Sequence, residues 1–209
     1  MVCFGAPDVG YNHVGVDDGW QVCGTGVDGG FHAPDGTPIL NTTKFHDLKG
    51  TVAYGHSKGV LMGWYDTNCI CCDEYKLQAN ETFAQLSYAA DVKMLRDADF
   101  DSIKQDNCGD DQGKGFVARM HYINTTGRPL LVEDSDQGHG MGAPRGLPVD
   151  PDGWCGANFF RAEGDIGPDF NGIVERPLDL VQYQDLRHPI SRPGCWAYLD
   201  SEWSETESA

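Results

Sequence analysis

Basic residues, long apolar segments and nucleotide-binding glycine motifs are scarce or absent in this 209-residue sequence. It has 15 Lys and Arg against 32 Asp and Glu, and its formal net charge of −17 argues against binding to nucleic acid or to an anionic membrane surface. No segment approaches about 18 consecutive apolar residues, so we expect no membrane span. No G-x-G-x-x-G or P-loop motif follows the first predicted strand, and nucleotide binding therefore has no support.

Metal-binding motifs are also missing. Cys69, Cys71 and Cys72 lie close enough together to suggest zinc, but the sequence has no second C-x-x-C pair and no H-x-x-x-H. We therefore expect neither a metal nor an organic cofactor.

The cysteines point instead to disulfides. The chain has eight of them, and three N-x-S/T sequons begin at Asn41, Asn80 and Asn124. Both features are typical of proteins of an oxidising compartment. Residues 1–7 lack the basic start and long apolar stretch of a signal peptide, so we expect a truncated N-terminus.

Short apolar runs alternate along the chain with longer segments of helical periodicity. Strands are predicted at residues 12–16, 60–65, 100–104, 129–132, 157–160 and 195–198. Helices are predicted at residues 45–58, 80–98 and 116–123, and residues 21–43 are predicted to be a long loop. This alternation indicates an α/β fold with a parallel sheet, either doubly wound or a barrel.

Carboxylates at the strand ends favour the barrel. They are Asp17, Asp18, Asp66, Asp106, Glu133 and Asp165. In a TIM (β/α)8 barrel all strand ends converge on one pocket, whereas an open sheet gathers ligands only at its switch point. A complete barrel needs about 250 residues, so this chain is expected to hold an incomplete one.

A pocket with several aspartates and no metal-binding histidine pair suggests a carbohydrate ligand. Sugar hydroxyls donate hydrogen bonds to carboxylates, and an aromatic ring such as Trp20 can cover an apolar sugar face. Hydrolysis of a glycoside needs two carboxyl groups, about 5–5.5 Å apart in a retaining enzyme. Asp106 and Asp165 are the candidates for nucleophile and acid/base, and Lys104 projects from the same face of its strand as Asp106.

At these residues the sequence resembles the family 27 glycoside hydrolases, the α-galactosidases and their relatives. Five segments carry the resemblance in the order of the family: Gly10-Tyr11 with Val16-Asp17-Asp18-Gly19-Trp20; Phe45-x-x-Leu48-Lys49 with His56-Ser57-Lys58-Gly59-Val60-x-Met62-Gly63-x-Tyr65; Lys104-Gln105-Asp106-Asn107-Cys108; Arg161-Ala162-Glu163-Gly164-Asp165-Ile166; and Pro193-Gly194-Cys195-Trp196 with Asp200.

The resemblance implies catalytic roles. Asp106 would form the glycosyl-enzyme, and Asp165 would be the acid/base. Asp17 and Asp18 would hold the 4- and 6-hydroxyls of galactose.

The remaining substrate-binding residues follow from the same resemblance. Lys104 and Arg161 would bind hydroxyls on the other side of the ring, Tyr65 would line the pocket, and Asp200 belongs to the seventh-strand motif. Glu133 matches a glutamate of α-galactosidases, where relatives acting on N-acetylgalactosamine have a small residue, and so favours a sugar with a 2-hydroxyl.

A disulfide is implied as well. In the family, the cysteine two residues past the nucleophile, here Cys108, is bonded to the loop after the third strand. Cys69, Cys71 and Cys72 compete for that position, and their spacing does not choose among them.

Several departures from the family pattern stand out. Residues 1–200 would form a partial barrel of about strands two to seven, without the C-terminal β-domain, and residues 201–209 read as an acidic tail. Ala197-Tyr198 replaces Asn-Asp in the seventh-strand motif. Gln105 replaces an apolar residue that points toward the helix layer, where an unpartnered amide costs about 1–3 kcal/mol.

Structural readings compete with the functional ones. Asp17-Asp18 and Asp106 are also typical of turns, Asp165 of a helix N-cap, and Glu133 of surface charge. Arg161 can pair with a structural carboxylate, and Tyr65 and Trp20 are as readily packing residues as ligands.

The leading hypothesis is a retaining glycoside hydrolase that removes terminal α-D-galactosyl residues by double displacement. The alternatives are an inactive fragment or galactose-binding pseudoenzyme, an α-N-acetylgalactosaminidase and a β-L-arabinopyranosidase. The resemblance implies an α-galactoside as the partner and a secreted, lysosomal or vacuolar location.

Overall fold

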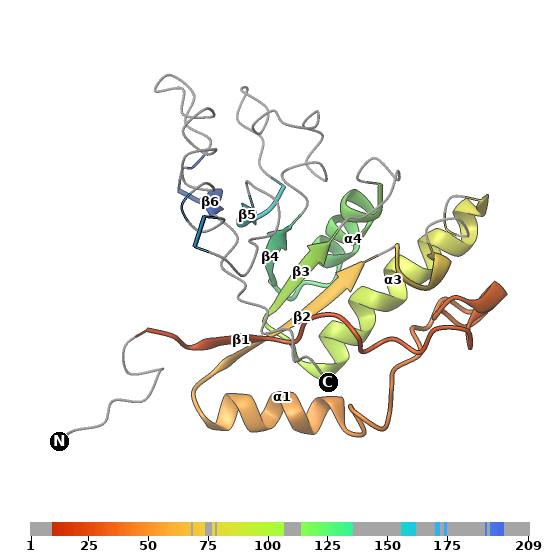
Figure 1. Ribbon diagram of the computed structural model, residues 1–209, viewed down its shortest axis with the longest axis horizontal. Helices are drawn as coiled ribbons and strands as arrows, with labels where there is room; N and C mark the ends of the chain where they lie inside the picture. The colour runs from red at the N-terminus through yellow and green to blue at the C-terminus, as the bar shows by residue number, and fades with distance from the viewer. Residues whose placement is uncertain are drawn as a thin grey trace.

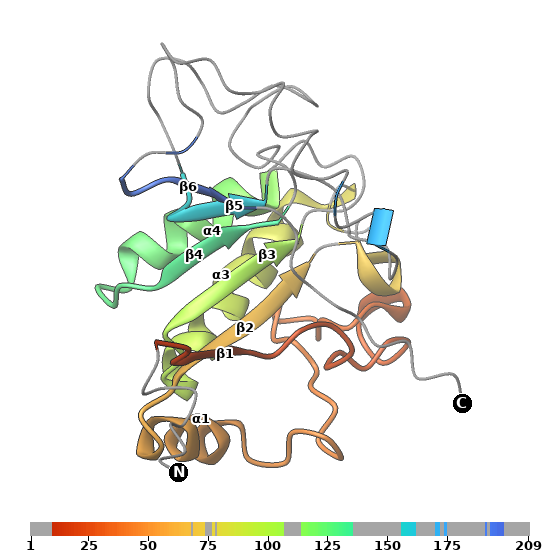
Figure 2. The same cartoon turned by 60° about the vertical axis from the view of Figure 1, so that its left-hand side comes forward.

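The structure is a computed structural model that describes residues 10–67, 69–73, 77, 79–106, 114–135, 156–161, 170–171, 174, 191 and 193–198. Its centre is a parallel sheet with helices packed against one face (Figures 1 and 2). The strands are β1 (His13–Gly15), β2 (Leu61–Thr67), β3 (Ser102–Asp106), β4 (Leu131–Asp134), β5 (Phe159–Arg161) and β6 (Trp196–Tyr198). The helices are α1 (Leu48–Ser57), α3 (Glu81–Ala98) and α4 (Lys114–Thr125), with short 3-10 turns η2 (Val27–Gly29) and η3 (Ile70–Cys72).

The six strands lie side by side in the order of the chain, β1-β2-β3-β4-β5-β6, and every pair is parallel. A doubly wound sheet reverses its strand order at a switch point, and the six described strands show no such reversal. Within the described residues β1 and β6 pair with one neighbour each, so the sheet is open. The predicted α/β fold with a parallel sheet of the barrel type is confirmed, and the described strands form a six-stranded partial barrel.

The helix ends follow from local capping. Asn80 precedes α3 and its side chain accepts a hydrogen bond from the backbone N–H of Phe83 at 3.1 Å. Asp99 ends the same helix in the left-handed conformation at φ 72°. Asp47 caps α1 in the same way, accepting from Gly50 N at 2.8 Å. All three predicted helices are therefore present, with ends shifted by up to a few residues.

The core lies between the sheet and the helices. Alternate strand residues, among them Ile103, Val132 and Phe160, point away from the pocket side and are almost fully buried. They belong to one apolar cluster that includes residues of α3 and α4. The strand residues between them point to the other, concave face of the sheet, where the polar side chains lie. None of the helices in the described part of the chain combines the length and apolar character that a membrane crossing requires.

Gln105 lies on the outer face of β3, as predicted. Its side chain is 0% exposed, and neither amide atom has a hydrogen-bond partner among the described residues. The polar amide therefore costs stability at a position surrounded by apolar packing.

Replacing Gln105 with methionine, which has a similar shape and no buried donor or acceptor, should raise the free energy of unfolding by about 1–3 kcal/mol. Urea denaturation of both proteins measures the difference. Gln85→Met is the matched control, because Gln85 on α3 is hydrogen-bonded to Glu81 and Tyr122 and should not gain stability. A loss of stability in Gln105→Met would show that the amide has a favourable partner.

Candidate active site

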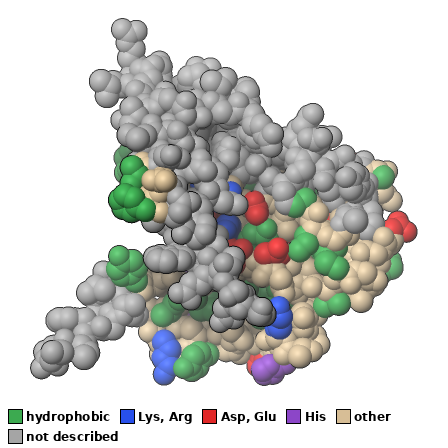
Figure 3. Space-filling view, in the orientation of Figure 1, with side chains coloured by type: hydrophobic (Ala, Val, Ile, Leu, Met, Phe, Trp, Pro, Cys, Tyr) green, Lys and Arg blue, Asp and Glu red, His purple; other side chains and the backbone are tan. Residues whose placement is uncertain are grey.

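A cavity of about 390 Å³ opens on the concave face of the sheet. Its floor is made of small residues, because Gly15, Gly63 and Ser102 are neighbours in register on three adjacent strands. A Cβ at Gly63 would lie 2.6 Å from Ser102 Oγ, so the close packing there requires glycine. Figure 3 shows acidic and basic side chains together in a hollow near the middle of one face of the molecule.

Four residues predicted from the sequence line this cavity: Asp17, Lys104, Glu133 and Arg161. They come from β3, β4 and β5 and from the end of β1, which are far apart in the sequence but adjacent in the sheet. The volume lies within the range of small-molecule sites.

Asp17 and Lys104 form an ion pair across the cavity. Lys104 Nζ lies 2.8 Å from Asp17 Oδ2, and the lysine side chain is largely buried whereas the aspartate is half exposed. The ammonium also lies over the ring of Tyr65, 5.6 Å from its centroid. These contacts fix the lysine among the polar groups of the inner face.

Tyr65 and Asp106 are hydrogen-bonded to each other. The phenol of Tyr65 donates to Asp106 Oδ2 at 2.7 Å. Burial, and then the negative charge of Asp106, raise the pKa of Tyr65, so the phenol stays protonated as a donor. Asp106 ends β3 two residues beyond Lys104 and on the same face, although neither Asp106 nor Tyr65 is among the residues that line the cavity.

Glu133 receives a hydrogen bond from the opposite side of the cavity. The hydroxyl of Tyr198 on β6 donates to Glu133 Oε1. The Tyr198 ring packs against Phe159 on β5, with ring centroids 5.6 Å apart, and both aromatic residues line the cavity. Tyr198 was not predicted as a site residue, because the family pattern has an aspartate there.

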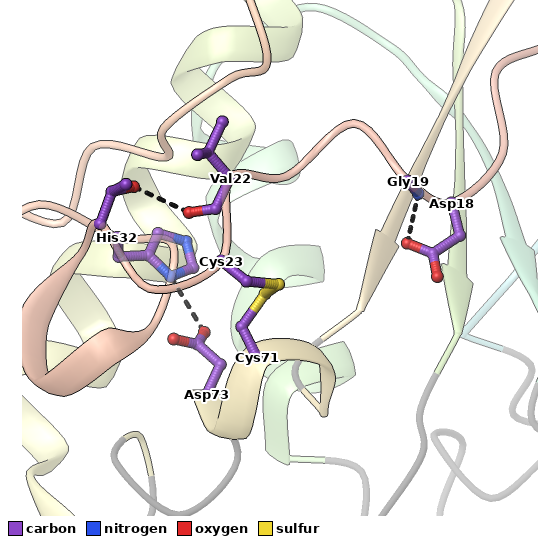
Figure 4. Close-up of a disulfide and its surroundings, with 8 residues drawn as sticks. Asp18, Gly19, Val22, Cys23, His32, Cys71 and Asp73 are labelled. Atoms are coloured by element: carbon purple, nitrogen blue, oxygen red, sulfur yellow. Dashed lines mark hydrogen bonds and ion pairs between the residues drawn. A yellow bond between two sulfur atoms is a disulfide. The ribbon is translucent and has the colours of Figure 1, made fainter.

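Asp18 does not line the cavity. Its side chain is exposed, and its carboxylate accepts a hydrogen bond from Gly19 N at 2.6 Å (Figure 4). Asp18 therefore stabilises the turn after β1, whereas Asp17 pairs with Lys104.

Trp20 was predicted to cover a sugar face, and the structure places it in the apolar core. Trp20 is 1% exposed and packs against Phe31 and Trp64, while its indole N–H donates to the carbonyl oxygen of Tyr65 at 2.9 Å. The residue is part of the core, and no ligand in the cavity can reach its ring.

Asp66 also departs from the prediction. It follows Tyr65 directly, so its side chain points to the outer face of β2, where Arg119 Nε of α4 lies 2.7 Å from Asp66 Oδ2. Burial and the charge of Asp91 raise the pKa of Asp66 to about 7, although Arg119 opposes the shift.

Asp66 belongs to a buried group of five charged side chains that we call the His32 cluster: His32, Asp66, Asp73, Asp91 and Arg119. His32 Nδ1 lies 2.9 Å from Asp73 Oδ2 and its Nε2 lies 2.9 Å from Asp91 Oδ1. Arg119 completes the cluster with an ion pair to Asp91 at 3.2 Å.

Burial alone would lower the pKa of His32, but the charges of Asp91 and Asp73 outweigh it and raise the pKa to about 10. His32 is therefore a cation at neutral pH. No motif spacing identified it in the sequence, because its partners lie 41 and 59 residues away.

A disulfide lies beside the His32 cluster. Cys23 in the long loop is bonded to Cys71 in η3, at a sequence separation of 48, and Figure 4 shows this bond next to the contact of His32 with Asp73. A cross-link of this span stabilises a fold by about 4 kcal/mol in the chain-entropy model. The sequence had allowed Cys71 as the partner of Cys108, and this bond to Cys23 excludes it. Cys69 and Cys195 are disulfide-bonded as well.

Three predicted residues, Asp165, Cys108 and Asp200, lie outside the described residues. Their roles stay predictions. Within the residues that are described, no group of three or more His, Cys, Asp or Glu side chains is placed to hold a metal ion.

Sequence comparison connects this site to known glycosidases. A "Probable alpha-galactosidase D" from Aspergillus niger is 25% identical over 221 residues, which cover 96% of this chain and 30% of the relative. An alpha-N-acetylgalactosaminidase from Gallus gallus is 23% identical over 194 residues, which cover 90% of this chain and 45% of the relative. The resemblance inferred from the motifs is thereby confirmed at low identity, over most of this chain and less than half of each of these relatives.

The other comparisons add little. No protein-family model matches the chain. A solved chitinase structure from Bacteroides thetaiotaomicron aligns at a TM-score of 0.43 and 9% identity over 78% of this chain and 52% of that chain.

The His32 cluster predicts a pH-dependent stability. Because the pKa of His32 is about 10 in the folded state and about 6.5 in the unfolded state, its contribution is complete below pH 6.5 and is lost as the pH rises through 10. The stability difference between the wild-type protein and His32→Gln should therefore shrink by roughly 3 kcal/mol from pH 7 to pH 10.

Urea unfolding at a series of pH values measures this difference. His46→Gln is the control, because His46 is exposed and lies outside the cluster. A constant difference between wild type and His32→Gln over this range would contradict a charged His32.

Proposed function

We propose that this protein is a retaining glycoside hydrolase that removes terminal α-D-galactosyl residues. The observation that carries the proposal is the position of Asp106: a carboxylate at the end of a central parallel strand, hydrogen-bonded by Tyr65, two residues beyond Lys104 on the face that holds the cavity. Curated relatives named as α-galactosidases and α-N-acetylgalactosaminidases support the same reaction class.

Asp106 is the proposed nucleophile. One of its oxygens attacks the anomeric carbon and forms a glycosyl ester, while the bond to the leaving oxygen breaks and Asp165 donates the proton that this oxygen needs. Water then attacks the ester, gives its proton back to Asp165, and releases the sugar with its original anomeric configuration.

Tyr65 orients the nucleophile in this proposal. Its hydroxyl holds Asp106 Oδ2, so Oδ1 is the oxygen that attacks. Since Tyr65 stays protonated, the hydrogen bond persists through both steps and is weakened only when Asp106 loses its charge in the ester.

Polar groups on both sides of the cavity bind the sugar. Asp17 and Lys104 bind hydroxyls from the β1–β3 side, and Arg161 and Glu133 from the β4–β5 side. Glu133 favours galactose, because a carboxylate accepts a hydrogen bond from a 2-hydroxyl and leaves less room for a 2-acetamido group. The relatives named as α-N-acetylgalactosaminidases make that activity the second candidate.

The remaining proposals concern the whole protein. We assign residues 1–200 to strands two to seven of the barrel and residues 201–209 to an acidic tail. Because the chain spans 30% and 45% of the two relatives compared, the activity of the whole protein is a proposal too. The Cys23–Cys71 disulfide favours a secreted, lysosomal or vacuolar location.

Replacing Asp106 with asparagine should lower turnover of an aryl α-galactoside by roughly a thousandfold or more, because the amide cannot form the glycosyl ester. Release of the phenol, followed by its absorbance, measures the rate. Asp97→Asn on the exposed face of α3 is the control and should keep full activity. Turnover that survives in Asp106→Asn would exclude Asp106 as the nucleophile.

The acid/base role of Asp165 predicts a dependence on the leaving group. Asp165→Ala should slow a substrate with a poor alcohol leaving group much more than one with an acidic phenol, which departs without protonation. Comparing kcat/KM of the two substrates in wild type and variant measures this effect. Equal losses on both substrates would exclude Asp165 as the acid.

An inactive galactose-binding remnant is the rival from another class. A wild-type chain that hydrolyses no α-galactoside but is protected by galactose against thermal unfolding would establish it.

A further inference from the structure

The Tyr198–Glu133 pair is the part of the cavity that departs most from the family pattern. The pattern has Asn-Asp where this chain has Ala197-Tyr198, and the second of these positions is the one that faces Glu133. An ionised aspartate at that position would be an acceptor and could not donate a hydrogen bond to Glu133. The phenol of Tyr198 is instead a neutral donor to Glu133.

We infer that Tyr198 is a positioning residue that determines sugar specificity by holding Glu133 as the acceptor for the 2-hydroxyl. The inference rests on the proposed function and deepens it.

Three contacts define the position of Tyr198. Its hydroxyl donates to Glu133 Oε1, its ring packs on Phe159 at 5.6 Å, and its backbone is paired in register with Arg161. The phenol therefore reaches Glu133 from a ring that is already fixed by β5. The hydrogen bond then costs little further side-chain entropy.

The same contact shows Glu133 acting as a hydrogen-bond acceptor. A hydrogen bond donated to a carboxylate favours its ionised form, which is an acceptor with about four lone-pair sites. Tyr198 donates to one of these sites. Glu133 consequently accepts from the ligand and does not donate to it.

The arrangement selects for a hydroxyl at one ring position. A sugar without its 2-hydroxyl leaves the fixed carboxylate without that partner inside the cavity, and unpaired polar groups in a binding site discriminate strongly. With a phenylalanine at position 198, Glu133 loses this donor, and we expect the protein to distinguish the two sugars less well.

Binding of galactose and of 2-deoxygalactose to the full chain, measured by calorimetry, tests the inference. Tyr198→Phe should reduce the preference for galactose over 2-deoxygalactose by about tenfold, with little change for 2-deoxygalactose itself. Glu133→Gln should reduce the preference similarly, and the double variant should lose no more than either single one, because Tyr198 acts through Glu133.

Tyr122→Phe is the matched control. It removes a phenol hydroxyl that donates to Gln85 at 2.8 Å between α4 and α3, away from the cavity, and should leave the preference unchanged.

Equal weakening of both sugars in Tyr198→Phe, or an unchanged preference, would overturn the role of Tyr198 while leaving the proposed function in place. A wild-type chain that binds neither sugar would overturn both.

Discussion

The two-residue period of the parallel strands is the constraint on which the rest of the structure depends. On β3 it separates Ser102, Lys104 and Asp106 on the concave face from Ile103 and Gln105 against the helices. A shift by one residue would bury the lysine and the aspartate in apolar packing. The same register that builds the core therefore brings the charged residues together around the cavity.

This period also explains which predictions succeeded. Strand positions, helix positions and the buried amide of Gln105 followed from local patterns, because alternation and capping are visible in the sequence. Trp20 and Asp66 depart from expectation for different reasons. Trp20 packs on Phe31 and Trp64, which only folding brings beside it. Asp66 directly follows Tyr65, so strand alternation turns it to the outer face, where it pairs with Arg119. His32 gave no signal, since its partners are brought together only by folding.

The charged groups of the protein fall into two classes with different physical roles. Around the cavity, Asp17 is half exposed and its pair with Lys104 remains open to a ligand that exchanges hydrogen bonds with both. In the His32 cluster the charges are almost fully withdrawn from water, and removal of one partner leaves another buried charge uncompensated. The first class is suited to binding, whereas the second holds the surrounding segments in one arrangement.

The His32 cluster has a consequence for how the molecule opens. A long loop without regular structure ordinarily exchanges its amide hydrogens early, by local fluctuations that leave the helices intact. Here His32 and the Cys23–Cys71 bond fasten the loop to α3 and to the segment after β2, and Arg119 fastens α3 to α4. Opening any one of these segments exposes charges held by the others, so we expect the loop to share the slow exchange of the helices.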